Sequence, residues 1–252
     1  MANSPPLRIN RNAEVRLHEV GDGRNCAIVD DVLENPEALI EFAVENASRF
    51  EWWSVPPGPR LIVSDNALQD LHRFIRSKLS RHFPIHRAGI ELNACLSTIT
   101  VPPEKLSHYQ RMCHRDHAET PGTRYYAGLV YLFRNQDLGG TAFYRWKKPD
   151  VIEEAERLHN IDPAAAVKYL DEALEIFREP PQYMTGSNDL AELLTVIPAR
   201  FNRLVFYDGE SPHSGYIAHP ELLSDDLSKG RLTLNFFSTA HARYAATSTL
   251  QA

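Results

Sequence analysis

The sequence predicts an α+β fold, in which a β-barrel or sandwich packs against helices on one side. Two observations support this class. Apolar residues recur at helical spacing in the first third of the chain, whereas from about residue 90 they alternate in short runs rich in β-branched and aromatic residues. Helices therefore come first and strands follow, with one helical segment interrupting the strands.

The N-terminal third is expected to support the strands that follow. Residues 25–33 predict a strand that leads into a helix at Asn35 and Pro36, because Asn is a favoured N-cap and Pro suits the first helical position. A second helix is expected from about Asp65 to His82. The buried stripes of the two helices are expected to be Leu39, Phe42, Ala43 and Ala47 in the first, and Leu68, Leu71, Ile75 and Leu79 in the second. Trp52 and Trp53 lie in the intervening Pro-rich loop, where packing is expected rather than a substrate entrance.

The predicted strands lie between residues 90 and 240. They are Ile90 to Val101, Tyr125 to Arg134, Gly140 to Trp146, Leu190 to Pro198, Arg203 to Tyr207 and Arg231 to Ser238. Residues 150–181 are helical in pattern, with Asp162 and Pro163 as the cap and first-turn pair. This segment is too short to bury its own core, so we expect an insertion in one domain, 1–252, made of a helical support (1–89) and a strand core (90–240).

Composition and charge exclude several classes of function. With 43% hydrophobic and 24% charged residues, the chain has the composition of a folded globule. Its net charge of −6 disfavours a nucleic-acid surface, so no nucleic-acid partner is expected. Its three cysteines, Cys26, Cys95 and Cys113, lack the spacing of a zinc site and suggest a reducing cytoplasm. Neither a membrane span nor a signal peptide is expected, and nothing indicates an oligomeric state.

A histidine and an aspartate two residues apart, His114 and Asp116, are the first candidate ligands. In an extended segment they leave the same face, whereas His117 leaves the opposite one. Such a pair is common by chance and needs a partner, which His213 supplies just after the apolar run 203–207. Two imidazoles and one carboxylate can bind one face of iron(II) and leave positions open. The other histidines are interpreted as structural or surface residues.

The C-terminal run predicts an anion site. Arg231, Thr233 and Asn235 share one face by alternation, and Leu232 and its apolar neighbours share the other. An arginine on an inward face is costly to bury unless it meets an anion. A dicarboxylate co-substrate would supply that anion, paired with Arg231 and assisted by the hydroxyl of Thr233.

These motifs, taken in order, resemble a known superfamily. His114-Arg-Asp116, Gly139-Gly-Thr-Ala-Phe-Tyr-Arg145, Asn202-Arg-Leu-Val205, His213-Ser-Gly215 and Gly230-Arg-Leu-Thr233 resemble the iron(II)/2-oxoglutarate-dependent dioxygenases over residues 25–240. Within that superfamily, the chain is most similar to an uncharacterised bacterial family. The segments between Asp116 and His213 and between His213 and Arg231 are longer than in compact members.

The resemblance implies a fold and an activity. The fold would be a double-stranded β-helix, a jelly-roll or cupin-like barrel packed against the N-terminal helices. Iron(II) would be held by His114, Asp116 and His213, and 2-oxoglutarate by Arg231 with Thr233. The activity would be hydroxylation of a small-molecule or peptide substrate, with release of succinate and CO2.

Two alternatives stay open at this point. One is a cupin-like metal-dependent oxygenase or isomerase that uses no 2-oxoglutarate. The other is a catalytically silent barrel that acts as a binding module, with the helices of 150–181 as its partner surface. A thiol nucleophile at Cys113 is not expected: adjacent residues of a strand face opposite ways, so packing explains the cysteine beside His114 better.

Overall fold

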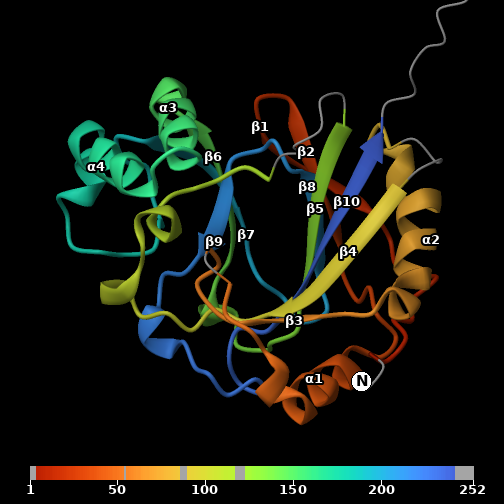
Figure 1. Cartoon of the computed structure of the whole chain (residues 1–252). Helices are drawn as coiled ribbons and strands as arrows, with labels where there is room; N and C mark the ends of the chain where they lie inside the picture. Colours follow the sequence, from red (N-terminus) through yellow and green to blue (C-terminus); the bar gives the residue numbers. More distant parts are fainter. Residues whose placement is uncertain (1–3, 54, 86–89, 117–122, 242–252) are drawn as a thin grey trace, which may run out of the picture.

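A computed structural model describes residues 4–53, 55–85, 90–116 and 123–241. In this part of the chain two antiparallel sheets face each other (Figure 1). The large sheet has the strand order β1-β2-β8-β5-β10-β4-β3, and the small sheet has the order β7-β6-β9. The strands of the large sheet are β1 Arg16–Gly21, β2 Arg24–Val29, β3 Arg60–Ile62, β4 Ile90–Ser97, β5 Thr123–Tyr131, β8 Leu204–Asp208 and β10 Thr233–His241. Those of the small sheet are β6 Gly140–Trp146, β7 Ala191–Ile197 and β9 His213–Tyr216.

The helices lie outside the two sheets. Their bounds are α1 Pro36–Glu45, α2 Gln69–Ser77, α3 Pro149–His159 and α4 Pro163–Ala173. Helices α1 and α2 lie beside the large sheet, and α3 and α4 lie together at the other side of the molecule, near β6 (Figure 1). No helix in the described part of the chain has the length and apolar character that crossing a membrane requires.

Side chains of β10 alternate between the two faces of the large sheet, one of which forms the core and the other the wall of a cavity. Leu234 and Phe236 are fully buried in the apolar core shared with α1 and α2. Thr233 and Asn235 point the other way and line a cavity. Because the side-chain period of a strand is two, one strand serves both the core and the cavity, as its sequence predicts.

The N-terminal third differs from the expected helical support. Its strands β1, β2 and β3 complete both edges of the large sheet. Pro36 begins α1 as expected, but Asn35 does not cap it, because its side chain bonds instead to the backbone of Pro6 and Arg8. The second helix is broken into α2 and flanking 3-10 turns, although its predicted apolar stripe is buried. In the first stripe, Ala47 is exposed in a 3-10 turn.

The predicted strands after residue 90 are present, with ends shifted by a few residues and Gly140–Trp146 in place. The insertion forms α3 and α4, and the side chain of Asp162 accepts hydrogen bonds from the first turn of α4 as predicted. The segment that begins at His213, just after the predicted strand 203–207, is itself strand β9 and pairs with β6. Pairing with a neighbouring strand, rather than local propensity, makes this short segment extended.

Candidate metal centre

The backbone brings the two distant ligand motifs together. His114 and His213 form an isolated antiparallel bridge, in which each backbone N–H donates to the other carbonyl, at 2.9 and 2.8 Å. The N–H of Asp116 donates to the carbonyl of Gly209 at 2.8 Å. The segment 114–116 is therefore held beside the start of β9 without being a regular strand. His117 lies outside the described residues.

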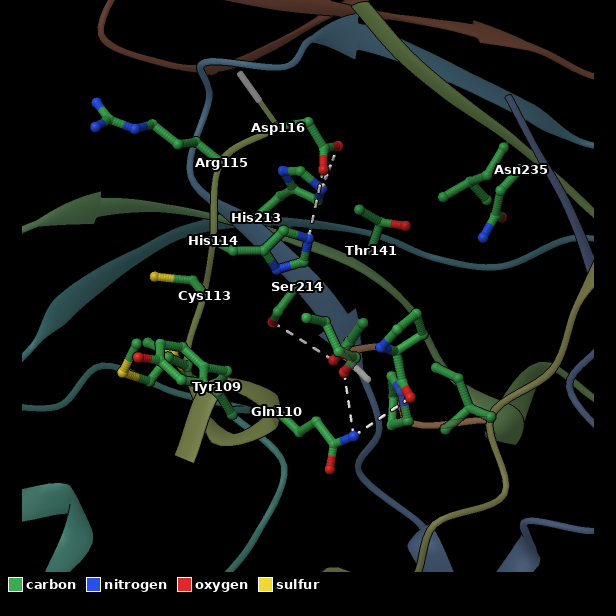
Figure 2. Close-up of a pocket in the computed structure, with 18 of the residues that line it drawn as sticks. Tyr109, Gln110, Cys113, His114, Arg115, Asp116, Thr141, His213, Ser214 and Asn235 are labelled. Atoms are coloured by element: carbon green, nitrogen blue, oxygen red, sulfur yellow. Dashed lines mark hydrogen bonds and ion pairs between the residues drawn. The ribbon is translucent and has the colours of Figure 1, made fainter. Parts of the chain in front are cut away.

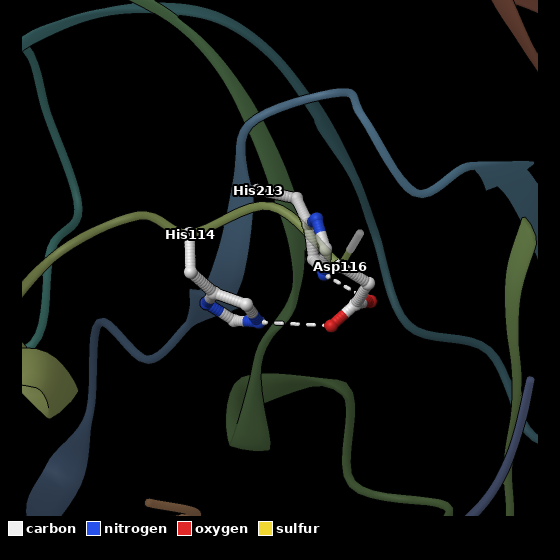
Figure 3. A group of neighbouring side chains, drawn as sticks. All are labelled: His114, Asp116 and His213. Carbon is white, nitrogen blue, oxygen red and sulfur yellow. Dashed lines mark ion pairs between the residues drawn. The ribbon is translucent and has the colours of Figure 1, made fainter. Parts of the chain in front are cut away.

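The three side chains converge on one point (Figure 3). Ligand atoms of His114, Asp116 and His213 all lie within 4.8 Å of one another. The Nε2 of His114 is 3.9 Å from one carboxylate oxygen of Asp116, and the Nε2 of His213 is 3.4 Å from the other. Two imidazoles and one carboxylate arranged in this way can occupy one face of a metal ion.

A hydrogen bond orients His213 for this role. Its Nδ1 lies 2.9 Å from the carbonyl oxygen of Ser211. A carbonyl only accepts, so Nδ1 carries a proton, and Nε2 is the ring nitrogen that faces Asp116. Metal-binding histidines are commonly oriented by such a bond at the second nitrogen.

The surroundings of His114 and Asp116 favour the protonation states in which these residues can bind a metal ion. Burial within the pocket lowers the pKa of His114 to about 4, the neighbouring His213 acts in the same direction, and Asp116 opposes both. Although 55% of the His114 side chain is open, it opens onto the cavity that the pocket residues enclose. Burial raises the pKa of Asp116, but His213, His114 and Arg60 outweigh burial and lower it overall. At neutral pH, His114 is therefore a neutral imidazole and Asp116 a carboxylate.

The centre opens into a cavity of about 430 Å³, which is within the range of small-molecule sites (Figure 2). Arg231 and Thr233 line the same cavity, as the sequence predicts. Arg231 is 4% exposed, and its guanidinium donates to the carbonyls of Leu138 and Gly140 at 3.0 and 2.9 Å. Among the described residues it has no salt bridge, and burial lowers its pKa. A buried cation without an anion is costly, so the site suits an anionic ligand.

The hydroxyl of Thr233 is already engaged. It donates to the carbonyl of Ser97 at 3.3 Å, so it would have to exchange that bond to donate to a ligand. Tyr131 and Thr141 were not predicted from the sequence, although their hydroxyls lie 2.8 Å apart and the ring of Tyr131 lies beside the guanidinium of Arg231. Pairing in β5 and β10 places Tyr131 opposite Thr233. Thr141 lies within the Gly-Gly-Thr motif, which could have drawn attention to it.

The helical insertion forms part of the cavity wall. Ile152, Ala155 and Glu156 of α3 line the cavity. The carboxylate of Glu156 accepts from Arg115 at 3.2 Å, and the Arg115 guanidinium lies over the ring of Trp146. Because Arg115 stands between His114 and Asp116 in the chain, α3 is joined directly to the segment that carries two of the ligands.

Trp52 and Trp53 do not pack into the core, but Trp53 makes a loop contact with the guanidinium of Arg60. They are 63% and 41% exposed, so neither is a core residue. Cys113 is buried as expected: its sulfur accepts a hydrogen bond from Trp146, and burial raises its pKa to about 12. A thiol held in this protonated form is a poor nucleophile.

Comparison with known families assigns the chain to one of them. The model of a family of unknown function, DUF6445, matches residues 11–238. The chain belongs to this family. Membership of an uncharacterised family, expected from the motifs, is thereby confirmed. A search of the curated proteins finds no match.

Several solved structures are similar to this member of the family in overall fold. HygX from Streptomyces hygroscopicus, with nickel and 2-oxoglutarate bound, is 14% identical, with 88% of this chain and 85% of HygX covered and a TM-score of 0.43. A prolyl-4-hydroxylase from Pseudomonas putida is 13% identical, with 88% and 94% covered and a TM-score of 0.43. The non-heme alpha ketoglutarate dependent epimerase SnoN is 12% identical, with 90% and 86% covered and a TM-score of 0.41. At these identities and TM-scores, the activity of this chain has to be argued from its own residues.

Proposed function

We propose that this protein is an iron(II)- and 2-oxoglutarate-dependent oxygenase that hydroxylates a small-molecule or peptide substrate and releases succinate and CO2. The observation that carries the proposal is the convergence of His114, Asp116 and His213 on a cavity whose buried Arg231 has no anionic partner among the described residues. The two facing sheets would be the two sides of a double-stranded β-helix in a single domain.

The chain's own residues would divide the work as follows. His114, Asp116 and His213 would hold iron(II), with the Nδ1–H of His213 fixed by Ser211. Arg231 would bind the far carboxylate of 2-oxoglutarate, and Thr233 would assist if it released Ser97. Iron(II) bound there would supply the redox chemistry that couples dioxygen reduction to oxidation of 2-oxoglutarate and substrate.

The walls around the centre would keep it shielded from bulk water. The rings of Tyr207 and Phe143 pack near the imidazole of His213, at centroid distances of 4.7 and 6.4 Å. Exclusion of water strengthens charge interactions in the site and protects a reactive oxidant. These aromatic residues would therefore shield one side of the ligand set.

The two alternatives have less support in the structure. A cupin-like enzyme without 2-oxoglutarate would leave the buried Arg231 without an anion. A silent binding module would use the helices of 150–181 as its partner surface, but α3 lines the cavity and pairs with Arg115. Both observations favour a 2-oxoglutarate enzyme in which the insertion shapes the substrate site.

Loss of one ligand tests the proposal. The wild-type protein, loaded with iron(II) without oxygen, should bind one iron and develop a weak visible charge-transfer band when 2-oxoglutarate is added. His213→Ala should lose both the iron and the band. His219→Ala is a matched control, because the side chain of His219 is exposed and, among the described residues, its one salt bridge is to Glu221. Normal iron content in His213→Ala, or no iron and no succinate release in the wild type, would overturn the assignment.

A further inference from the structure

Three arginines line the cavity beside the metal centre: Arg60, Arg115 and Arg231. Arg115 faces two carboxylates, Glu156 at 3.2 Å and Glu210 at 3.8 Å. Arg231 is the proposed partner of the co-substrate. Among the described residues, no salt bridge and no side-chain hydrogen bond involves Arg60. Arg60 is therefore the cavity cation that the proposed function leaves without a partner.

Strand pairing fixes where Arg60 stands. Arg60 of β3 pairs with Ser97 of β4, and Ser97 pairs with Thr233 of β10. All three line the cavity. Neighbouring strands are about 4.8 Å apart, so Arg60 lies two strands, or roughly 10 Å, from Thr233 along the same face. This separation places Arg60 at the edge of the sheet, away from the strand that carries the co-substrate's arginine.

The surroundings of Arg60 hold it ready to bind an anion. Its guanidinium lies 5.3 Å over the ring of Trp53, and its Nε is shielded from solvent without an acceptor. A shielded donor without an acceptor is unfavourable, and an anion that pairs with the guanidinium would relieve it. The adjacent rim of the cavity consists of residues 55–57. It is held by the side-chain amide of Gln110, which donates to the carbonyls of Val55 and Pro56 at 3.1 and 3.3 Å.

The chemistry of the rim indicates what else the ligand carries. Val55, Pro56 and Pro57 line the cavity next to Arg60, and they offer apolar surface. A single planar guanidinium matches a carboxylate through two parallel N–H···O bonds. A phosphate, with its greater charge, is commonly held by several cations. The other two cavity arginines are already assigned, because Arg115 faces Glu156 and Glu210 and Arg231 is the proposed partner of the co-substrate.

We propose that Arg60 binds a carboxylate of the substrate, and that the substrate is a small organic acid whose apolar part contacts the rim of residues 55–57. This inference rests on the proposed function in one respect. The two carboxylates of 2-oxoglutarate would be taken by the metal and by Arg231, so an anion at Arg60 must belong to another molecule. Arg60 would thus select acids over their neutral analogues, and Trp53 would be a positioning residue that holds the guanidinium.

The test compares acids with their neutral amides. Dissociation constants are measured by ligand-observed NMR for 3-phenylpropionate against 3-phenylpropionamide, and for N-acetylphenylalanine against its amide. The full chain is used without metal or 2-oxoglutarate. The wild type should bind each acid at least tenfold more tightly than its amide, because charge-assisted pairs have about this effect. In a chain that also carries Arg231→Met, Arg60→Met should lose the preference, and Arg60→Lys should keep part of it.

The comparison is made in the Arg231→Met background as well, because Arg231 lines the same cavity and, without 2-oxoglutarate, could itself pair with an acid. The preference for acids should persist in Arg231→Met, since Arg60 is still present. Affinity for the amides should be unchanged in Arg60→Met, which separates a lost charge pair from a misfolded rim. Equal binding of acid and amide by the wild type, including no binding of either, would overturn the proposal. So would a preference that survives when Arg60→Met is combined with Arg231→Met, or one that disappears in Arg231→Met alone.

The two proposals can fail separately. The binding comparison involves no iron and no turnover, so a carboxylate preference at Arg60 can be found even if the protein never consumes 2-oxoglutarate. Conversely, iron binding and succinate release can be normal while acids and amides bind alike.

Discussion

Replacing Arg231 by methionine tests the anion site most directly. Methionine keeps an unbranched apolar chain but has no donors. Charge-assisted hydrogen bonds contribute about 1.5–3 kcal/mol, so the dissociation constant for 2-oxoglutarate should rise roughly ten- to a hundredfold. Iron binding should be unaffected, because Arg231 is not among the ligand atoms that converge near Asp116.

The same change also affects stability, and the structure offers a matched control. The carbonyls of Leu138 and Gly140 would lose their donors, while the desolvation of a buried cation would be relieved. A net loss of about 1–3 kcal/mol is expected. Arg111 is also buried and also donates to two carbonyls, but it lies outside the cavity. Arg111→Met should therefore lose similar stability and keep its affinity for 2-oxoglutarate.

The assay is an anaerobic titration of the iron-loaded proteins with 2-oxoglutarate, followed by the visible charge-transfer band, with metal content and urea unfolding measured on the same samples. The reasoning would be refuted if Arg231→Met bound 2-oxoglutarate like the wild type, or if it lost iron while its affinity was unchanged. An equal loss of affinity in Arg111→Met would show that the effect is structural.

Two further predictions concern the fold. Asp30 pairs with Arg203 at 2.6 Å, which together with neighbouring arginines lowers its pKa, so Asp30→Asn should cost about 1–3 kcal/mol at neutral pH. Because the folded-state pKa lies below the unfolded value of about 3.9, this stability is present above that value and is lost as the pH falls through the folded pKa. Urea unfolding from pH 7 to pH 3 checks this, and a difference independent of pH would contradict it. Gly128→Ala would place a Cβ 2.2 Å from the ring of Phe236, so thermal and urea unfolding should show a loss of about 1–3 kcal/mol, whereas Gly186→Ala, with nothing within 4 Å, should be near neutral. Equal stability of the two glycine variants would refute the packing argument.

Periodicity predicted the elements whose burial is local. The alternation of residues 231–236 separates core from cavity, and the apolar stripe of residues 68–79 is buried, as a repeating pattern requires. Patterns of this kind are set by neighbours in the sequence. The pairing of Asp162 with the first turn of α4 is likewise a local capping interaction, and it could be read from two adjacent residues.

Features that depend on distant partners could not be read in this way. The edge strands β1 and β3 were missed, because short edge strands are defined by the strands they join, whereas the strand predicted within residues 25–33 is present as β2. Asn35 was expected to cap a helix, but the N-terminal segment that passes beside it offers competing backbone partners. The role of α3 as a cavity wall depends on Arg115 and Glu156, which are far apart in the sequence.

The sequence was sufficient to name His114, Asp116, His213 and Arg231, because their residue types and order carry a chemical pattern. It could not show that the first three converge within 4.8 Å, since that depends on the backbone bridge between His114 and His213. Nor could the sequence single out Arg60, which is an arginine at the start of the short strand β3. Arg60 lines the cavity without a partner because of where β3 and Trp53 hold its side chain. Whether a charged side chain has a partner depends on residues that only the folded chain brings close.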